Sequence, residues 1–203
     1  HPVAHSFPTR RSSDLVDSGE GWNEAYRSTN VQSGLPGQQP MENMSFPILL
    51  GGYCCYRVHH YSGPTSVDME IFSVDGRTLT SFVPDGSLLY PADVPTALSV
   101  AALDTGPPYL LEEYSSAGPT NGPGGSLDGG IVKPDISGFA NVSTWSYDPR
   151  GGARPFAGTS AACPHVAGAA ALVWSVFPDY TTDQVRQFLE SRAIDMGPAG
   201  KDN

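Results

Sequence analysis

The chain has 203 residues, of which 39% are hydrophobic and 16% are charged. This balance excludes a disordered tail and allows one globular domain or a large part of one. The net charge of -10 gives a surface that repels nucleic acid phosphates and anionic lipids, so neither nucleic acid nor a membrane is expected as a partner. The sequence contains no run of about 18 apolar residues, and it therefore predicts no membrane-spanning helix.

The first residues look foreign to the rest of the chain. Residues 5–15 read HSFPTRRSSDL, which matches the translation of a widely used short-read sequencing adapter. We therefore interpret residues 1–15 as an artefact and leave them out of the fold prediction, and we expect the coding sequence that preceded them to be missing. Residues 16–45 are polar and rich in Gly, Pro, Asn and Gln without a sustained period, which predicts a loop or a remnant.

Short runs typical of β-strands follow within residues 46–86. Tyr53–Tyr61 reads as one strand, and Val67–Val74 reads as a second in which apolar and acidic residues alternate. Asp75 and Gly76 come next and permit the positive φ angles of a tight hairpin turn. The sequence predicts a small antiparallel β unit here, with an independent binding module as the alternative interpretation.

Residues 87–203 have the character of an α/β fold. Ala97–Leu103 is a short apolar run that predicts a strand. Ala161–Phe177 is apolar nearly all round and rich in small residues, which predicts a buried central helix. Thr181–Arg192 has one apolar face and a threonine at its start that can cap it, so it predicts an amphipathic helix.

The strongest chemical signal is the run GTSAACPHVAG at residues 158–168. A serine hydroxyl becomes a good nucleophile when it is held in place and a base accepts its proton. At the first turn of a helix, Ser160 would lie beside unpaired backbone N–H groups that stabilise a developing oxyanion. Gly158 leaves room for a substrate backbone, and Pro164 favours helix initiation because a lost donor costs little in the first turn. Four small residues let this helix pack tightly: Ala161, Ala162, Ala167 and Gly168.

This run resembles the serine motif of the subtilisin-like serine protease family, whose usual form has another small residue in place of Cys163. Further segments resemble the family in the same order: LYPADVPTALSVAALD at 89–104, YSSAGPT at 114–120, KPDISGFANVST at 133–144 and PDYTTDQVRQFLESRA at 178–193. The resemblance implies an α/β fold, with a mainly parallel sheet flanked by helices, of which residues 87–203 are the C-terminal part. The β unit before residue 87 would then be an insertion.

The resemblance also implies a reaction, the hydrolysis of peptide bonds through an acyl-enzyme on Ser160. The Ser160 backbone N–H would donate to the oxyanion hole, Thr159 would support it, and Gly158, Pro164 and His165 would be structural members of the motif. The family's base lies in a His-Gly-Thr segment and its second oxyanion donor in a Gly-Asn segment, and neither segment occurs here. We therefore expect the 203 residues to be inactive as they stand.

The resemblance also has implications for the binding partner and the cellular location of the protein. A protein or peptide substrate is the expected partner, and secretion or an extracytoplasmic location follows from the resemblance. Calcium is common in the family, but no cluster of ligands stands out in the sequence, so no metal or cofactor is assigned.

Three histidines do not fit the role of catalytic base or metal ligand. Five residues at about 100° each place His165 roughly 140° around the helix axis from Ser160 and about 7.5 Å along it, which rejects His165 as the base. His59 and His60 are neighbours on a predicted strand, so their side chains point to opposite faces and do not share one metal.

Acidic and thiol groups also have ordinary interpretations. Asp17 begins an Asp-Ser-Gly run similar to the family's aspartate motif, but the expected histidine segment does not follow it. Asp135 matches a structural segment of the family. The vicinal pair Cys54 and Cys55, together with the distant Cys163, gives neither a disulfide framework nor a zinc spacing, so we expect buried or half-buried thiols.

Two other classes of protein remain to be weighed. A non-catalytic binding or scaffold protein could share the fold after losing its base. An α/β-hydrolase would need the pentapeptide Gly-x-Ser-x-Gly at its nucleophile, and the sequence has none.

Overall fold

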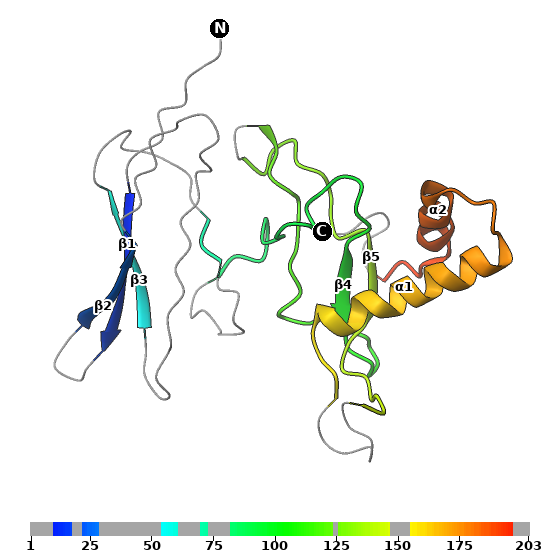
Figure 1. The fold of residues 1–203 in the computed structure, drawn as a ribbon, viewed down its shortest axis with the longest axis horizontal. Helices are drawn as coiled ribbons and strands as arrows, with labels where there is room; N and C mark the ends of the chain where they lie inside the picture. The colour runs from blue at the N-terminus through cyan, green and yellow to red at the C-terminus, as the bar shows by residue number, and fades with distance from the viewer. Residues whose placement is uncertain are drawn as a thin grey trace, which may run out of the picture. The chain divides into compact units, whose positions relative to one another are not determined.

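Figure 1 shows the computed structural model of the chain. The structure describes residues 10–17, 22–28, 54–60, 70–72, 82–123, 126–146 and 155–196. The chain divides into two compact units, residues 1–69 and residues 70–203.

The first unit contains a three-stranded antiparallel sheet with the strand order β2-β1-β3. β1 is Arg10–Asp17, β2 is Trp22–Ser28 and β3 is Cys54–His60. β1 is the central strand, and its register with β3 runs from Arg10 opposite His60 to Val16 opposite Cys54. The sheet therefore combines β1 and β2, which are neighbours in the sequence, with β3, which lies far from both.

This sheet includes segments for which the sequence predicted no strand. Residues 10–15 form most of β1, and their interpretation as an artefact stays a prediction. β2 lies within residues 16–45, which were expected to form a loop or a remnant. The physical reason is that a strand can be held by ladder hydrogen bonds without the alternating apolar pattern used to recognise it.

The strand predicted at Tyr53–Tyr61 is present as β3, but its partner strand in the sheet is β1, which precedes residue 46. The predicted hairpin is not seen where the structure describes it, because residues 70–72 and 82–84 have no regular secondary structure. The rest of that hairpin, including Asp75 and Gly76, lies outside the described residues.

The second unit has an α/β arrangement. β4 (Val100–Leu103) and β5 (Ile136–Phe139) form a parallel pair, in register from Val100 opposite Ile136 to Leu103 opposite Phe139. α1 (Thr159–Val176) contacts both strands and also α2 (Thr182–Arg192). The predicted parallel sheet with helices is thus found as two strands and two helices in the described part of this unit.

Small residues allow α1 to approach the sheet closely. Ala102, Ala140 and Ala162 are all fully buried and form the core between the strands and the helix. A Cβ added to Gly138 of β5 would lie 2.5 Å from the carbonyl oxygen of Ala162, so only glycine fits there. This close contact fixes the N-terminal end of α1 against β5.

The burial predicted for α1 is wrong for most of its length. The helix begins two residues before the predicted start, and its buried residues are Ala161, Ala162 and Val166. Leu172 is 71% exposed and Val176 is 67% exposed. A helix that is apolar on all sides needs cover on all sides, and the strands and α2 cover one side only. Among the described residues, no helix is long and apolar enough to cross a membrane.

α2 begins with a capping box. The Thr181 hydroxyl accepts a hydrogen bond from the Gln184 amide at 3.3 Å, and the Gln184 side chain accepts one from the Thr181 amide at 2.8 Å. Together these bonds satisfy two donors that a helix end otherwise leaves open. Val185 is buried, so the predicted amphipathic helix and its threonine cap are both confirmed.

Candidate active site

Ser160 is exposed and is the second residue of α1, directly after Thr159. Gly158 is the N-cap residue and supplies no side-chain cap, while its carbonyl accepts a hydrogen bond from the Ala161 amide at 2.9 Å. The amides of Thr159 and Ser160 belong to the first turn, where helix geometry provides no intrahelical acceptor. Ser160 therefore lies at the N-terminus of a helix, where first-turn amides can donate hydrogen bonds to a negatively charged oxygen and the helix dipole favours that charge.

Gly158 has a φ angle of 92°, a conformation that residues with a side chain rarely adopt. An added Cβ would meet only the Ser160 amide nitrogen, at an ordinary contact distance of 3.7 Å. Glycine is therefore favoured by the backbone conformation, and the room for a substrate backbone beside it stays a prediction.

The sequence predicted that Pro164 lies in the first turn of the helix, and the structure places it one turn later. It is the sixth residue of α1, because the helix begins at Thr159 and not at Ala161. A proline has no N–H, so the hydrogen bond that residue 164 would donate to the Ser160 carbonyl cannot form. The missing backbone N–H thus lies in the second turn of α1, four residues after Ser160.

His165 and Cys163 lie on the same helix. His165 Nδ1 lies 2.8 Å from the Ala161 carbonyl oxygen one turn earlier, which makes it a donor to its own helix. The structural role of His165 in the motif stays a prediction. Cys163 is a free thiol and is exposed, whereas the sequence predicted a buried or half-buried one.

Residues singled out in the first unit have a described backbone only. Asp17 ends β1, while His59 and His60 are neighbours at the end of β3. The side chains of these three residues, and those of Cys54 and Cys55, lie outside the described part of the structure.

Tyr114 is a residue at this site that sequence reasoning missed. Its hydroxyl accepts a hydrogen bond from the Gly158 amide at 3.1 Å, across 44 residues of sequence. Tyr114 lies in the connection between β4 and β5, within the recognised segment YSSAGPT. No local pattern marks it, because its partner is a backbone amide in a distant segment.

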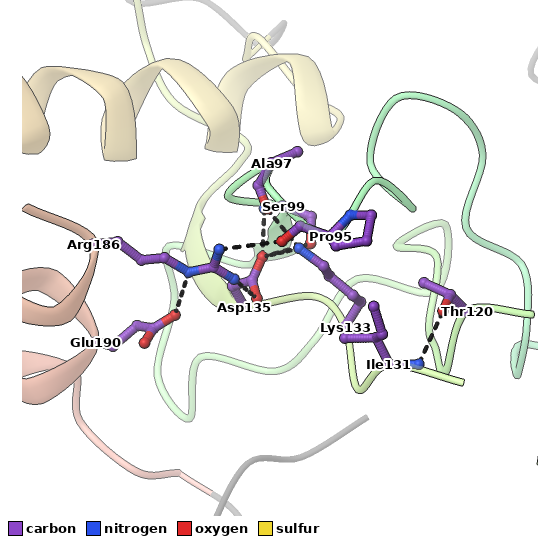
Figure 2. Close-up of polar contacts among 9 residues, drawn as sticks. All are labelled: Pro95, Ala97, Ser99, Thr120, Ile131, Lys133, Asp135, Arg186 and Glu190. Atoms are coloured by element: carbon purple, nitrogen blue, oxygen red, sulfur yellow. Dashed lines mark hydrogen bonds and ion pairs between the residues drawn. The ribbon is translucent and has the colours of Figure 1, made fainter. Parts of the chain in front are cut away.

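A cluster of polar side chains lies at the N-terminal ends of β4 and β5. It includes Asp135, which the sequence predicted to be structural. Figure 2 shows Asp135 between Lys133 and Arg186. One Asp135 oxygen lies 2.6 Å from Lys133 Nζ and the other 2.5 Å from Arg186 Nη2, and both the Asp135 and Lys133 side chains are fully buried. Ser99 donates to Asp135 through its amide at 2.8 Å and its hydroxyl at 3.0 Å. Lys133 also donates to the Ala97 carbonyl at 2.5 Å.

Arg186 joins α2 to this group. Desolvation acts to lower the pKa of Arg186, but its hydrogen bond with Glu190 and the charge of Asp135 outweigh this effect. The pKa of Arg186 is therefore raised above its ordinary value, and the guanidinium stays charged. With all these partners, Asp135 holds the strand, the preceding loop and α2 together, which is the structural role predicted for it.

The described residues contain no group of three or more His, Cys, Asp or Glu side chains that could hold a metal ion.

Comparison with known proteins gives a consistent result. The subtilisin of Bacillus pumilus is 39% identical over 108 residues, which cover 53% of this chain and 34% of that protein. The subtilisin of Bacillus sp. (strain TA39) is 36% identical over 114 residues, 54% of this chain and 26% of that protein. The halolysin-like extracellular serine protease Nep of Natrialba magadii is 31% identical over 115 residues, 55% of this chain and 18% of that protein.

The chain thus spans about a third or less of the length of these relatives. No solved structure matches it. The model of the Subtilase family matches residues 78–203, which include the serine motif, both helices and the parallel strands. The chain therefore belongs to the subtilase family.

Proposed function

We propose that this chain carries the nucleophile of a serine endopeptidase that hydrolyses peptide bonds through an acyl-enzyme on Ser160. One observation carries the proposal: Ser160 is exposed at the second residue of α1, beside first-turn amides without intrahelical acceptors. A peptide carbonyl bound here would meet the hydroxyl at its carbon and the Ser160 amide at its oxygen. Family membership over residues 78–203 supports the same reaction.

The reaction follows from this placement. The Ser160 oxygen attacks the carbonyl carbon while a histidine base accepts the hydroxyl proton. The resulting oxyanion accepts a hydrogen bond from the Ser160 amide, and Thr159 lies beside it in a supporting position. The amine leaves with the proton returned by the base, and water then repeats the sequence to release the acid.

We further propose that the base, its orienting aspartate and the second oxyanion donor come from polypeptide outside these 203 residues. His165 is unsuited to the role of base because helix geometry places it roughly 140° around the axis from Ser160 and about 7.5 Å along it. The matched span, which is only 18% to 34% of three relatives, supports this division of the catalytic residues. The 203 residues by themselves are therefore expected to be inactive.

The proposed substrates are proteins or peptides, and the proposed location is outside the cytoplasm. The net charge of -10 disfavours nucleic acid as a partner. One relative, from Natrialba magadii, is named an extracellular serine protease, which supports secretion.

The test begins with the genomic sequence upstream of Val16. If it contains the expected aspartate and His-Gly-Thr segments, the full-length protein is expressed and its hydrolysis of casein and of a peptide anilide is measured. Ser160→Ala is expected to lower turnover by at least about 1000-fold, because the nucleophile is lost. Ser175→Ala is the matched control, since Ser175 is an exposed serine of the same helix whose hydroxyl donates to the Leu172 carbonyl.

Turnover retained in Ser160→Ala would contradict the proposal. A natural start codon near Val16, together with an inactive protein that keeps its fold, would instead favour a non-catalytic binding or scaffold protein of the same family.

A further inference from the structure

Tyr114 is held firmly near the start of α1. The residue after it, Ser115, is buried, and its hydroxyl accepts a hydrogen bond from the Ala102 amide of β4 at 3.0 Å. The Glu112 amide donates to the Ala102 carbonyl at 2.9 Å, and the Ser115 amide donates to the Glu112 carbonyl at 2.8 Å. These bonds fasten the segment 112–115 to the core strand, so the Tyr114 backbone has a rigid support.

The Tyr114 hydroxyl accepts its hydrogen bond from the amide of Gly158, a glycine of the serine motif with wide conformational freedom. Gly158 lacks a Cβ, and its φ angle of 92° lies in a region that glycine enters at little cost. Its two torsions set the direction of the next peptide groups, which carry the Thr159 and Ser160 amides. A contact that fixes the Gly158 amide therefore restricts the orientation of the turn before Ser160.

We propose that Tyr114 is a positioning residue for Ser160, acting through the hydrogen bond between its hydroxyl and the Gly158 amide. The proposal rests on the proposed function for its catalytic consequence. The hydroxyl keeps Gly158 in its left-handed conformation, so that the Ser160 oxygen and the Ser160 amide face the same carbonyl group. Without this hydrogen bond, the peptide groups between Gly158 and Ser160 sample other orientations, and Ser160 is less often aligned with the carbonyl of a bound peptide.

The matched pair of variants is Tyr114→Phe and Tyr109→Phe. Tyr109 lies in the same connection between β4 and β5, and its ring contacts Phe139 with centroids 5.7 Å apart. Within the described residues its hydroxyl has no hydrogen-bond partner, so its removal tests the loss of a hydroxyl from the same loop. Tyr114 is 49% exposed, and the change to phenylalanine keeps the ring, so the fold is expected to survive.

The first measurement needs no enzymatic activity. In the 203-residue chain, hydrogen exchange by NMR is followed at the Gly158 and Ser160 amides. Tyr114→Phe is expected to speed exchange at Gly158 by about 10-fold and to shift the Ser160 amide resonance, because a hydrogen bond that protects Gly158 is lost. Tyr109→Phe is expected to leave both amides unchanged. Unchanged amides in Tyr114→Phe would overturn the proposal.

The second measurement uses the full-length protein and a peptide anilide substrate. Tyr114→Phe is expected to lower kcat by about 10-fold while KM changes less than about 2-fold, since orientation and not binding is affected. An unchanged kcat, or a loss confined to KM and thermal stability, would overturn the positioning role. If the unmodified protein shows no peptidase activity while the Gly158 amide responds as expected, the proposed function fails and the positioning of the turn stands.

Discussion

Gly138 of β5 lies directly against Ala162 of α1, with space for no side chain between them. A Cβ added to Gly138 would approach the Ala162 carbonyl oxygen to 2.5 Å and the Val166 side chain to 3.2 Å. Because Ala162 is only two residues beyond Ser160, the distance between strand and helix also sets the place of the nucleophile candidate. The sheet thereby positions the site through a contact that contains no catalytic group.

Gly138→Ala is expected to move the start of α1 away from β5. The clash is with a backbone oxygen, which cannot rotate aside, so we expect a loss of about 1 to 3 kcal/mol in the free energy of unfolding. Urea unfolding followed by circular dichroism measures this loss. Gly106→Ala is the control, because the nearest atom to its added Cβ is an Asp104 oxygen at 3.7 Å. Equal stability of the two variants would contradict the close contact.

Asp135→Asn is expected to destabilise the second unit more than other losses of a carboxylate. The change leaves the fully buried Lys133 ammonium and the Arg186 guanidinium without their shared counter-charge, which costs about 3 to 5 kcal/mol. Asp128→Asn, at an exposed position, is expected to stay within about 0.5 kcal/mol of the unmodified chain.

A double-mutant cycle measures the interaction between Lys133 and Asp135 directly. Lys133→Met combined with Asp135→Asn is expected to cost less than the sum of the two single changes, because the first removes a charge that the second would leave unpaired. Strict additivity in urea unfolding would show that the two side chains do not interact.

The raised pKa of Arg186 gives a prediction for pH dependence. A group whose pKa is higher in the folded than in the unfolded chain adds stability that is complete below the unfolded pKa. That stability is lost only as the pH rises through the folded pKa, which for this guanidinium lies far above neutrality. The cost of Arg186→Ala, about 1 to 2 kcal/mol for a side chain that is 25% exposed, is therefore expected to stay constant from about pH 7 to pH 9.

Urea unfolding of Arg186→Ala and of the unmodified chain across this range measures the difference. Arg192→Ala controls for the loss of a positive charge from the same helix. The Arg192 guanidinium lies over the Phe188 ring, 5.2 Å from its centroid, and not beside Asp135. A cost of Arg186→Ala that shrinks as the pH rises from 7 to 9 would contradict a guanidinium that stays charged in the folded chain.

The features that could be predicted from the sequence are those encoded by neighbouring residues. The capping box needs only Thr181 and Gln184, three positions apart, and both its residues can be read directly from the sequence. The helix position is predicted from the run of small apolar residues that begins at Ala161, two residues after the observed start of α1. Local signals of this kind predicted both helices and the strand β4, whereas the parallel sheet was implied by the family resemblance.

Features that depend on distant partners could not be predicted. Asp135 accepts hydrogen bonds from Ser99, 36 residues earlier, and from Arg186, 51 residues later. A fully buried Lys133 runs against the usual exposure of lysine, and only its carboxylate and carbonyl partners explain it. β1 was not predicted for a different reason, because residues 1–15 were set aside as an artefact, whereas the structure pairs this strand with two others.

The exposed residues of α1 have a consequence for how the chain behaves in solution. Leu172 and Val176 stand one helical turn apart, and both present more than half of their surface to water. The net charge of -10 keeps separate copies at a distance in dilute buffer. Added salt weakens that repulsion, with a Debye length of only about 3 Å at 1 M, and leaves the attraction between apolar surfaces intact. Solubility of the isolated chain should accordingly fall, and light scattering should rise, as the ionic strength increases.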